Sequence, residues 1–194
     1  KFACFKPNIQ DYRENFNKAA QIMQNKDVGQ ILMKCGLNKH SKVVDAGGGT
    51  GNFSISIAQF VEQVYTFEIN PNHYKAVQEN IKLTSTENII LSKESIYEGI
   101  PADINNVDLI NLDLPEPCLA LEKVYKNLKV GGYVSVYLPN LTQMQQIFPN
   151  KYLLVELFET LERQWVISKK QLRPDFQMLG HSGFIAILRK ISND

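Results

Sequence analysis

Short apolar runs alternate with amphipathic segments along the chain from about Asp27 onward. The runs have the length of buried strands, and the segments between them, such as 72–83 and 119–128, repeat apolar residues at three- and four-residue steps. This alternation predicts an α/β fold built on a largely parallel, doubly wound sheet. The strands predicted in this way are 43–44, 64–67, 89–91, 107–112, 133–138 and 184–188.

The end of the chain departs from this alternation. Residues 165–167 and 184–188 are strand candidates with no helical segment between them. Because two such strands lack a crossover helix, we expect them to pair as an antiparallel hairpin. A Rossmann-like sheet that finishes in this way resembles the class I methyltransferases at the level of the fold.

The composition is that of an ordinary globular protein of one domain, with 194 residues and a net charge of +1. Such a charge excludes a strongly basic protein that coats nucleic acid, although a local basic patch remains compatible with it. No apolar run approaches the roughly 20 residues that cross a bilayer, so we expect no membrane contact. Cys4, Cys35 and Cys118 show no C-x-x-C spacing, which predicts reduced thiols in a cytoplasmic protein and no metal site.

The most informative stretch runs from Val43 to Phe53, where an apolar strand ends in Asp45 and glycines recur at Gly47, Gly49 and Gly51. Glycine lets the backbone turn tightly and lets a ligand approach the main chain. The helix that follows presents free N–H groups in its first turn. The spacing G-x-G-x-G differs from the dinucleotide pattern G-x-G-x-x-G, which disfavours a dehydrogenase. A plain glycine-rich turn is the alternative.

The next two predicted strands end in residues that suit a nucleoside. Glu68 follows the second strand, where a carboxylate can accept hydrogen bonds from both ribose hydroxyls. Ser95 and Ile96 follow the third strand, where Ser95 would polarise an adenine edge and Ile96 would pack on the adenine face. An acidic residue in solvent at a strand end is the alternative for Glu68.

The fourth predicted strand delivers Asp113 into a loop that Pro115 and Pro117 stiffen. A rigid backbone suits a group that takes part in chemistry, so we predict that Asp113 is catalytic. In the alternative, Asp113 caps the next helix.

With this loop the sequence resembles the tRNA (adenine-N1) methyltransferases that act on the T-loop, in particular the archaeal and bacterial forms. Their Asp-hydrophobe-Pro-acid-Pro loop matches 113–117, and their Arg-Pro and later Gly-His-Thr-Gly match Arg173-Pro174 and 180–183. Gln21 and the pair at 26–27 also match, and the resemblance extends over essentially the whole chain. The chain departs from the family at Cys118, where a Trp is usual, and at Asn25, where a Pro is usual.

The resemblance implies S-adenosylmethionine as the cofactor, tRNA as the partner and a homotetramer. It also implies that residues 1–17 are a linker from an N-terminal β domain and that 18–194 form the methyltransferase domain. Pro115, Arg173 and His181 are the expected substrate-binding residues. The expected cofactor-binding residues are Gln21, Asp45, Gly47, Gly49, Gly51, Asn52, Phe53, Glu68, Ser95, Ile96 and Asp113.

The expected reaction is methylation of N1 of a T-loop adenine, adenine(58), with Asp113 accepting a hydrogen bond from the exocyclic amine. The base must be extruded from its stack, and Pro115, Pro117 and Tyr137 are candidates to pack on it. Lys169, Lys170 and Arg173 form a basic cluster that would meet phosphates or simply face solvent. Two alternatives stay open: a methyltransferase of small molecules or tetrapyrroles, and a non-catalytic tRNA-binding subunit of the same fold.

Overall fold

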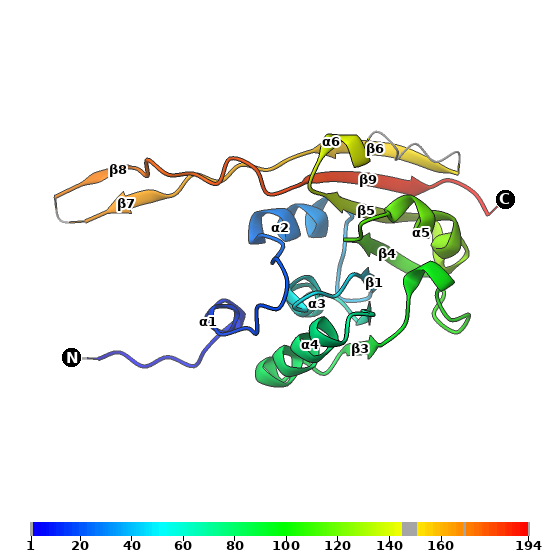
Figure 1. Cartoon of the computed structure of the whole chain (residues 1–194), viewed down its shortest axis with the longest axis horizontal. Helices are drawn as coiled ribbons and strands as arrows, with labels where there is room; N and C mark the ends of the chain where they lie inside the picture. The colour runs from blue at the N-terminus through cyan, green and yellow to red at the C-terminus, as the bar shows by residue number, and fades with distance from the viewer. Residues whose placement is uncertain (1, 145–150, 169, 194) are drawn as a thin grey trace.

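A single sheet of seven strands forms the centre of the molecule, in a computed structural model that describes residues 2–144, 151–168 and 170–193 (Figure 1). The strands are β1 Lys42–Ala46, β2 Gln63–Phe67, β3 Ile89–Ser92, β4 Val107–Leu112, β5 Leu128–Leu138, β6 Tyr152–Phe158 and β9 Phe184–Lys190. They lie in the order β3-β2-β1-β4-β5-β9-β6. The first five pair in parallel, whereas β9 lies antiparallel between β5 and β6. The order reverses between β1 and β4, and in open α/β sheets ligands bind at such a point.

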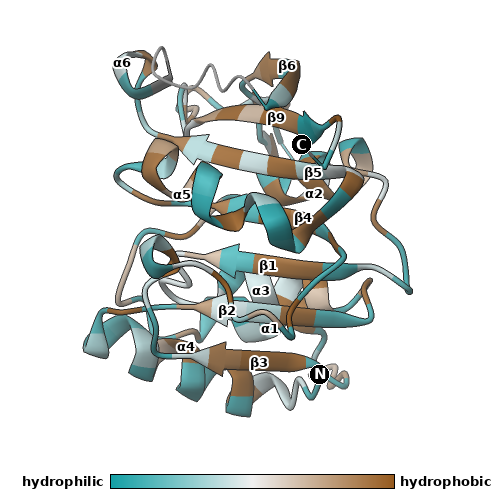
Figure 2. Ribbon diagram, turned by 90° about the vertical axis from the view of Figure 1, so that its right-hand side faces the viewer, coloured by the Kyte–Doolittle hydropathy of each residue, from teal (hydrophilic) through white to brown (hydrophobic). Residues whose placement is uncertain are grey.

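Helices cover both faces of this sheet, and hydrophobic residues are concentrated along its strands (Figure 2). Val44 packs in a buried cluster with Leu121, whereas its neighbour Val43 packs in a second cluster with Ile31 and Ile57. Side chains alternate between the faces of a strand, so each face has its own core. The helices are α1 Ile9–Glu14, α2 Asn25–Lys34, α3 Asn52–Ala58, α4 Pro71–Thr84, α5 Pro117–Val124 and α6 Leu141–Met144, with 3-10 turns at Ile96–Glu98 and Tyr125–Asn127.

The predicted parallel strands and helices are confirmed, with small changes in their limits. The helix predicted over 72–83 is α4, where Pro71 occupies the first turn and the side chain of Asn70 accepts two backbone N–H groups. The helix predicted over 119–128 ends earlier, at Val124, because a 3-10 turn follows and β5 already begins at Leu128. Within the described ranges, no helix is both long and apolar enough to cross a membrane.

The predicted pairing of 165–167 with 184–188 is wrong. Residues 165–167 form β7 (Trp165–Ile167), which pairs antiparallel with β8 (Leu172–Pro174) in a separate two-stranded sheet. The strand β9 pairs instead with β5 and with β6. The strand β6 was not among the strands predicted from the hydrophobic pattern. The fold class is nevertheless as predicted, because the open sheet does end in antiparallel strands.

Residues 159–183, here termed the arm, connect β6 to β9 and contain β7 and β8. The arm extends away from the sheet (Figure 1). Its two ends return to the same place, beside the start of α2, where side chains of Thr160 and Ser182 both contact Lys26. The arm is therefore fixed to the body at its base.

The predicted linker, residues 1–17, contains α1, which a capping box of Asn8 and Asp11 begins. Its last residue exchanges hydrogen bonds with α4, since Asn17 N donates to Asn80 Oδ1 at 2.8 Å and Asn80 Nδ2 donates to Asn17 O at 3.2 Å. That this segment joins two domains stays a prediction.

Candidate functional site

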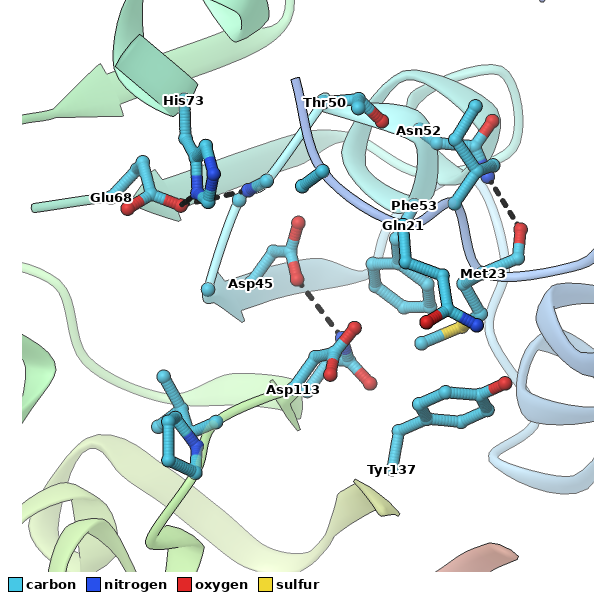
Figure 3. Close-up of a pocket in the computed structure, with 18 of the residues that line it drawn as sticks. Gln21, Met23, Asp45, Thr50, Asn52, Phe53, Glu68, His73, Asp113 and Tyr137 are labelled. Carbon is cyan, nitrogen blue, oxygen red and sulfur yellow. Dashed lines mark hydrogen bonds and ion pairs between the residues drawn. The ribbon is translucent and has the colours of Figure 1, made fainter. Parts of the chain in front are cut away.

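A cavity of about 530 Å³ opens at the carboxyl ends of β1, β2, β4 and β5 (Figure 3). Its walls come from the segment before α2, the glycine loop after β1, the start of α4 and the loops after β4 and β5. This is the place where the strand order reverses, and the predicted residues Gln21, Asp45, Gly47, Gly49, Asn52, Phe53, Glu68, Asp113 and Pro115 all line it.

The glycine loop passes so close to the loop after β4 that a side chain would not fit between them. Gly47 has φ +88°, and a Cβ placed on it would lie 2.1 Å from the carbonyl oxygen of Asp113. The backbone N–H groups of Gly47 and Gly48 both donate to Phe67 O, at 3.1 and 3.2 Å. The loop is thereby fixed between β2 and the loop after β4.

The third glycine of the pattern has a different role. Gly51 is the N-cap of α3, with φ +77°, and a Cβ on it would lie 3.0 Å from Val77. It lies outside the cavity lining. Its position in the motif therefore serves the packing of α3 on α4.

Asn52, which begins α3, presents an unpaired acceptor at the cavity wall. Its Nδ2 donates to Met23 O at 2.8 Å, but its Oδ1 is buried and has no partner (Figure 3). A buried acceptor without a partner costs free energy, so this atom is suited to a ligand that donates a hydrogen bond. Phe53 beside it is buried at 5% exposure and gives the wall an apolar part.

Glu68 at the end of β2 is held rigidly at 7% exposure. Its Oε2 accepts from Gly49 N and its Oε1 accepts from Asn70 N, both at 2.8 Å. His73 Nδ1 lies 3.7 Å from Oε2. Each carboxylate oxygen has two lone pairs, so one on each oxygen is left for a ligand.

Asp45 lies beneath the loop at 1% exposure. Its carboxylate accepts from Ser54 Oγ and, at 2.9 Å, from Asn111 Nδ2. Burial raises the pKa of Asp45 to about 6, the two hydrogen bonds oppose this shift, and the charge of Glu68 adds to it. Asp45 thus places negative charge under the cavity.

Asp113 follows β4, and its backbone N–H donates to Ala46 O at 3.0 Å. Its side chain faces the cavity (Figure 3). Asp113 is exposed where it borders the open cavity, but the protein atoms packed around its carboxyl disfavour the charged form and, together with the charge of Asp45, raise the pKa of Asp113 to about 7. The capping alternative is wrong, because Glu116 is the N-cap of α5 and no side chain caps that helix.

Ser95 and Ile96, the residues predicted to surround adenine, lie outside the lining of this cavity. Ser95 is the N-cap of a 3-10 turn and accepts from Tyr97 N at 3.3 Å, and Ile96 is buried in the core at 3% exposure. Neither lines the main cavity, whereas Tyr97 does. The 3-10 turn buries its first residue, Ile96, in the core, and its second residue, Tyr97, reaches the cavity.

Arg173 and His181 also lie outside the cavity lining. Arg173 is on β8, where its guanidinium carbon lies 4.0 Å from the ring centre of Phe176. His181 bridges two loops at the base of the arm: its Nδ1 lies 3.1 Å from Glu159 Oε2 and its Nε2 lies 2.9 Å from Pro139 O. Both neighbours are acceptors, which raises the pKa of His181 because the doubly protonated ring can donate to both. Of the basic cluster, Lys169 lies outside the described residues.

Several cavity residues were not predicted from the sequence, among them His73, Tyr97 and Ser182. His73 lies two residues after a helix-starting proline, a signal that would place it beside Glu68. Tyr137, expected only as a stacking candidate, lines the cavity from the end of β5.

The chemistry of this cavity fits S-adenosylmethionine. The acids Asp45, Glu68 and Asp113 suit a ligand that carries a sulfonium and an ammonium charge, and Asn52 Oδ1 can accept from that ammonium group. The glycine loop leaves room for close approach of a ligand to the backbone.

Comparison with known proteins agrees with this chemistry. A family model described as the tRNA methyltransferase complex GCD14 subunit matches residues 6–182. The chain is 26% identical to the Methanocaldococcus jannaschii tRNA (adenine(57)-N(1)/adenine(58)-N(1))-methyltransferase TrmI, over 97% of the chain and 78% of that protein. It is 27% identical to a Thermus thermophilus tRNA (adenine(58)-N(1))-methyltransferase TrmI, over 98% of the chain and 77% of that protein.

Solved structures show the same fold. The tRNA (m1A58) methyltransferase TrmI of Aquifex aeolicus superposes with a TM-score of 0.88 at 27% identity, covering 97% of the chain and 78% of that structure. A precorrin-6y C5,15-methyltransferase of Geobacter metallireducens reaches a TM-score of 0.71 at 16% identity, over 91% of the chain and 95% of that structure, a likeness that shows the fold alone. Because the family model matches most of the chain, this chain belongs to the family of the tRNA methyltransferase complex GCD14 subunit.

Proposed function

We propose that this chain is a tRNA (adenine-N1) methyltransferase that transfers a methyl group from S-adenosylmethionine to N1 of the T-loop adenine, adenine(58). The observation that carries the proposal is the carboxyl of Asp113, which a proline-stiffened loop presents to a cavity suited to the cofactor. Family membership and the names of the TrmI relatives support the same reaction.

In this proposal, Glu68 binds the two ribose hydroxyls with its remaining lone pairs, since Gly49 and Asn70 already hold its carboxylate in place. Asn52 Oδ1 accepts from the ammonium group, and Gly47 and Gly49 allow close backbone approach. Four further residues line the same cavity and complete the proposed site: Gln21, Asp45, Phe53 and Tyr97.

The cofactor supplies a methyl group that a sulfonium activates for transfer. Asp113 accepts a hydrogen bond from the exocyclic amine of adenine, which orients N1 and stabilises the positive charge that develops on the base. The carboxylate form is the one that accepts, and the raised pKa of Asp113 lets it take a proton from the methylated base afterwards. Asp113 thus binds, orients and receives a proton.

The target base has to leave its stack to reach this site, at a cost of a few kcal/mol. Pro115 and the ring of Tyr137 line the cavity and offer it apolar walls. Arg173 lies on the arm and would meet the RNA away from the reacting base. His181 holds the loops of the arm base together and has no nitrogen left to act as a general base.

The two alternatives have less support. The likeness to the precorrin methyltransferase lies at the level of the fold, and no residue of the cavity favours a tetrapyrrole. A non-catalytic subunit has no need of Gly47, Glu68 and Asp113 together in one cavity.

The proposal includes self-association, and we expect the chain to act in the cytoplasm, where tRNA is modified. The outer strand β6 supports self-association, since Leu153, Val155 and Leu157 are about half exposed there. An apolar edge strand favours pairing with another chain. Light scattering of the purified protein measures its mass, and a monomer at micromolar concentration would contradict this part.

The direct experiment incubates the protein with an unmodified tRNA transcript and S-adenosylmethionine labelled in its methyl group. We expect label in the tRNA and none in a matched transcript whose T-loop adenine is replaced by guanine. Equal label in both transcripts would contradict the assignment of the target base. Label in neither, with measurable cofactor binding, would contradict tRNA as the substrate.

A further inference from the structure

The proposed mechanism leaves one fully buried acid without a role. Asp27 lies in the first turn of α2 at 0% exposure. Its carboxylate accepts four hydrogen bonds, two on each oxygen. The donors are Lys26 Nζ at 3.1 Å, Thr160 Oγ1, Ser182 Oγ at 2.9 Å and Tyr137 OH at 3.3 Å.

These donors come from four separate parts of the chain. Thr160 and Ser182 lie near the two ends of the arm, Tyr137 lies near the end of β5, and Lys26 precedes Asp27 in α2. Lys26 also donates to Thr160 O at 3.0 Å and to Ser182 Oγ. The ammonium group thus balances the buried charge and reaches both ends of the arm.

This cluster forms part of the cavity wall. Tyr137 and Ser182 line the cavity together with Asp113. A Cβ on Gly183 would lie 2.5 Å from Cζ of Tyr137, so the ring packs directly on backbone. The hydroxyl of Tyr137 points away from Asp113 (Figure 3), and Asp27 accepts from it on that side.

We propose that Asp27 is a positioning residue for methyl transfer: its buried carboxylate holds the Tyr137 ring and both ends of the arm in place, and so fixes the wall against which the target base lies. This proposal rests on the proposed function. Burial, followed by the negative charge of Asp27, raises the pKa of Tyr137, which keeps its hydroxyl protonated and able to donate. Asp27 itself does not line the cavity.

The expected consequence is a kinetic one. A displacement of about 1 Å in a positioning wall lowers a rate by about 100-fold. Asp27→Asn has the same shape but offers one acceptor oxygen in place of two, and its amide faces donors. We expect kcat for tRNA methylation to fall by at least about tenfold, with the affinity for S-adenosylhomocysteine unchanged, because Glu68 and Asn52 are not touched.

A second variant keeps the test valid if Asp27→Asn fails to fold. Asp27→Asn alone leaves Lys26 charged and nearly buried, so Lys26→Met/Asp27→Asn removes both charges together. The matched control is Lys129→Met/Asp108→Asn, which removes a Lys–Asp ion pair that lies outside the cavity lining. Ser182→Ala should lose part of the activity, and Ser182→Thr should recover most of that loss because it restores the hydroxyl.

Coupling to Tyr137 is measured by a double-mutant cycle. If Asp27 acts through the Tyr137 hydroxyl, Tyr137→Phe should lower kcat much less in the Asp27→Asn background than in the wild type. Additive effects would overturn this route. Wild-type kcat in the folded Lys26→Met/Asp27→Asn protein, or an equal loss of S-adenosylhomocysteine affinity, would overturn the proposal.

Hydrogen exchange separates this proposal from the proposed function. If wild-type protein methylates no tRNA, the proposed function fails, and exchange of backbone amides in 159–163 and 180–184 still reports on Asp27. Faster exchange there in the double variant, with unchanged exchange in β1 and β4, would support the anchoring role. Unchanged exchange at both ends of the arm would overturn it.

Discussion

Replacing Gly47 by alanine tests how closely the glycine loop and the Asp113 loop depend on each other. The new Cβ would lie 2.1 Å from the carbonyl oxygen of Asp113, whereas Cβ contacts under 3.0 Å are essentially never found. The Asp113 loop therefore has to retreat by nearly 1 Å. Since the Asp113 carboxyl is the proposed catalytic group, the retreat should show in the reaction rate.

The magnitude follows from two separate effects. A left-handed backbone costs an L-residue about 1–2 kcal/mol, which should appear in the free energy of unfolding. A misplacement of about 1 Å costs about 100-fold in rate, equal to about 2.7 kcal/mol of transition-state stabilisation. Gly36→Ala is the matched control, because Gly36 has φ +61° and no atom within 4 Å of a Cβ on it.

The assay combines urea unfolding with kcat/KM for tRNA methylation. Both variants should lose the stability that the left-handed backbone costs, and Gly47→Ala should lose more because its Cβ also displaces the Asp113 loop; only Gly47→Ala should lose activity on the scale given. If the two variants have indistinguishable kcat/KM while both remain folded, the loops are not coupled and the reasoning is refuted.

Three further predictions concern single side chains. Glu68→Ala should weaken S-adenosylhomocysteine binding by about 1–3 kcal/mol in calorimetry, and unchanged affinity would remove the ribose assignment. The kcat/KM should rise with pH through about 7 as Asp113 ionises. This limb should be absent in Asp113→Asn and persist in His181→Ala; its persistence in Asp113→Asn would assign it to another group. Because the pKa of Asp113 is raised in the folded chain, its contribution to stability is complete below its unfolded pKa of 3.8 and is lost as the pH rises through about 7. Asp113→Asn should therefore unfold at a higher temperature than the wild type at pH 8, but not at pH 3.5. Equal unfolding temperatures at pH 8 would contradict the raised pKa.

Much of the site could be predicted because parallel strands bring their carboxyl ends to one edge. Asp45 lies near the end of β1, Glu68 and Asp113 directly follow β2 and β4, and all three line one cavity. Ser95 and Ile96 follow the same rule but lie outside the cavity lining, because Ser95 caps a 3-10 turn and Ile96 is buried in the core. Local turn geometry of this kind leaves no periodic signal.

The antiparallel part of the sheet was harder to predict for a related reason. Residues 152–158 are apolar almost without interruption, so they lack the alternation that identifies a strand. Their partner β9 lies about 30 residues later in the chain and beyond the arm. The role of Asp27 was likewise hidden, because its donors at 137, 160 and 182 are distant in sequence.

The central claim is that Asp113 directs a methyl group to N1 of a tRNA adenine. The most direct measurement is mass spectrometry of nucleosides from tRNA that has been incubated with S-adenosylmethionine and either the wild type or Asp113→Ala. The account predicts 1-methyladenosine with the wild type and none above background with Asp113→Ala, although calorimetry shows that the variant still binds the cofactor. Undiminished 1-methyladenosine with the variant, or a methyl group on another nucleoside with the wild type, would contradict it.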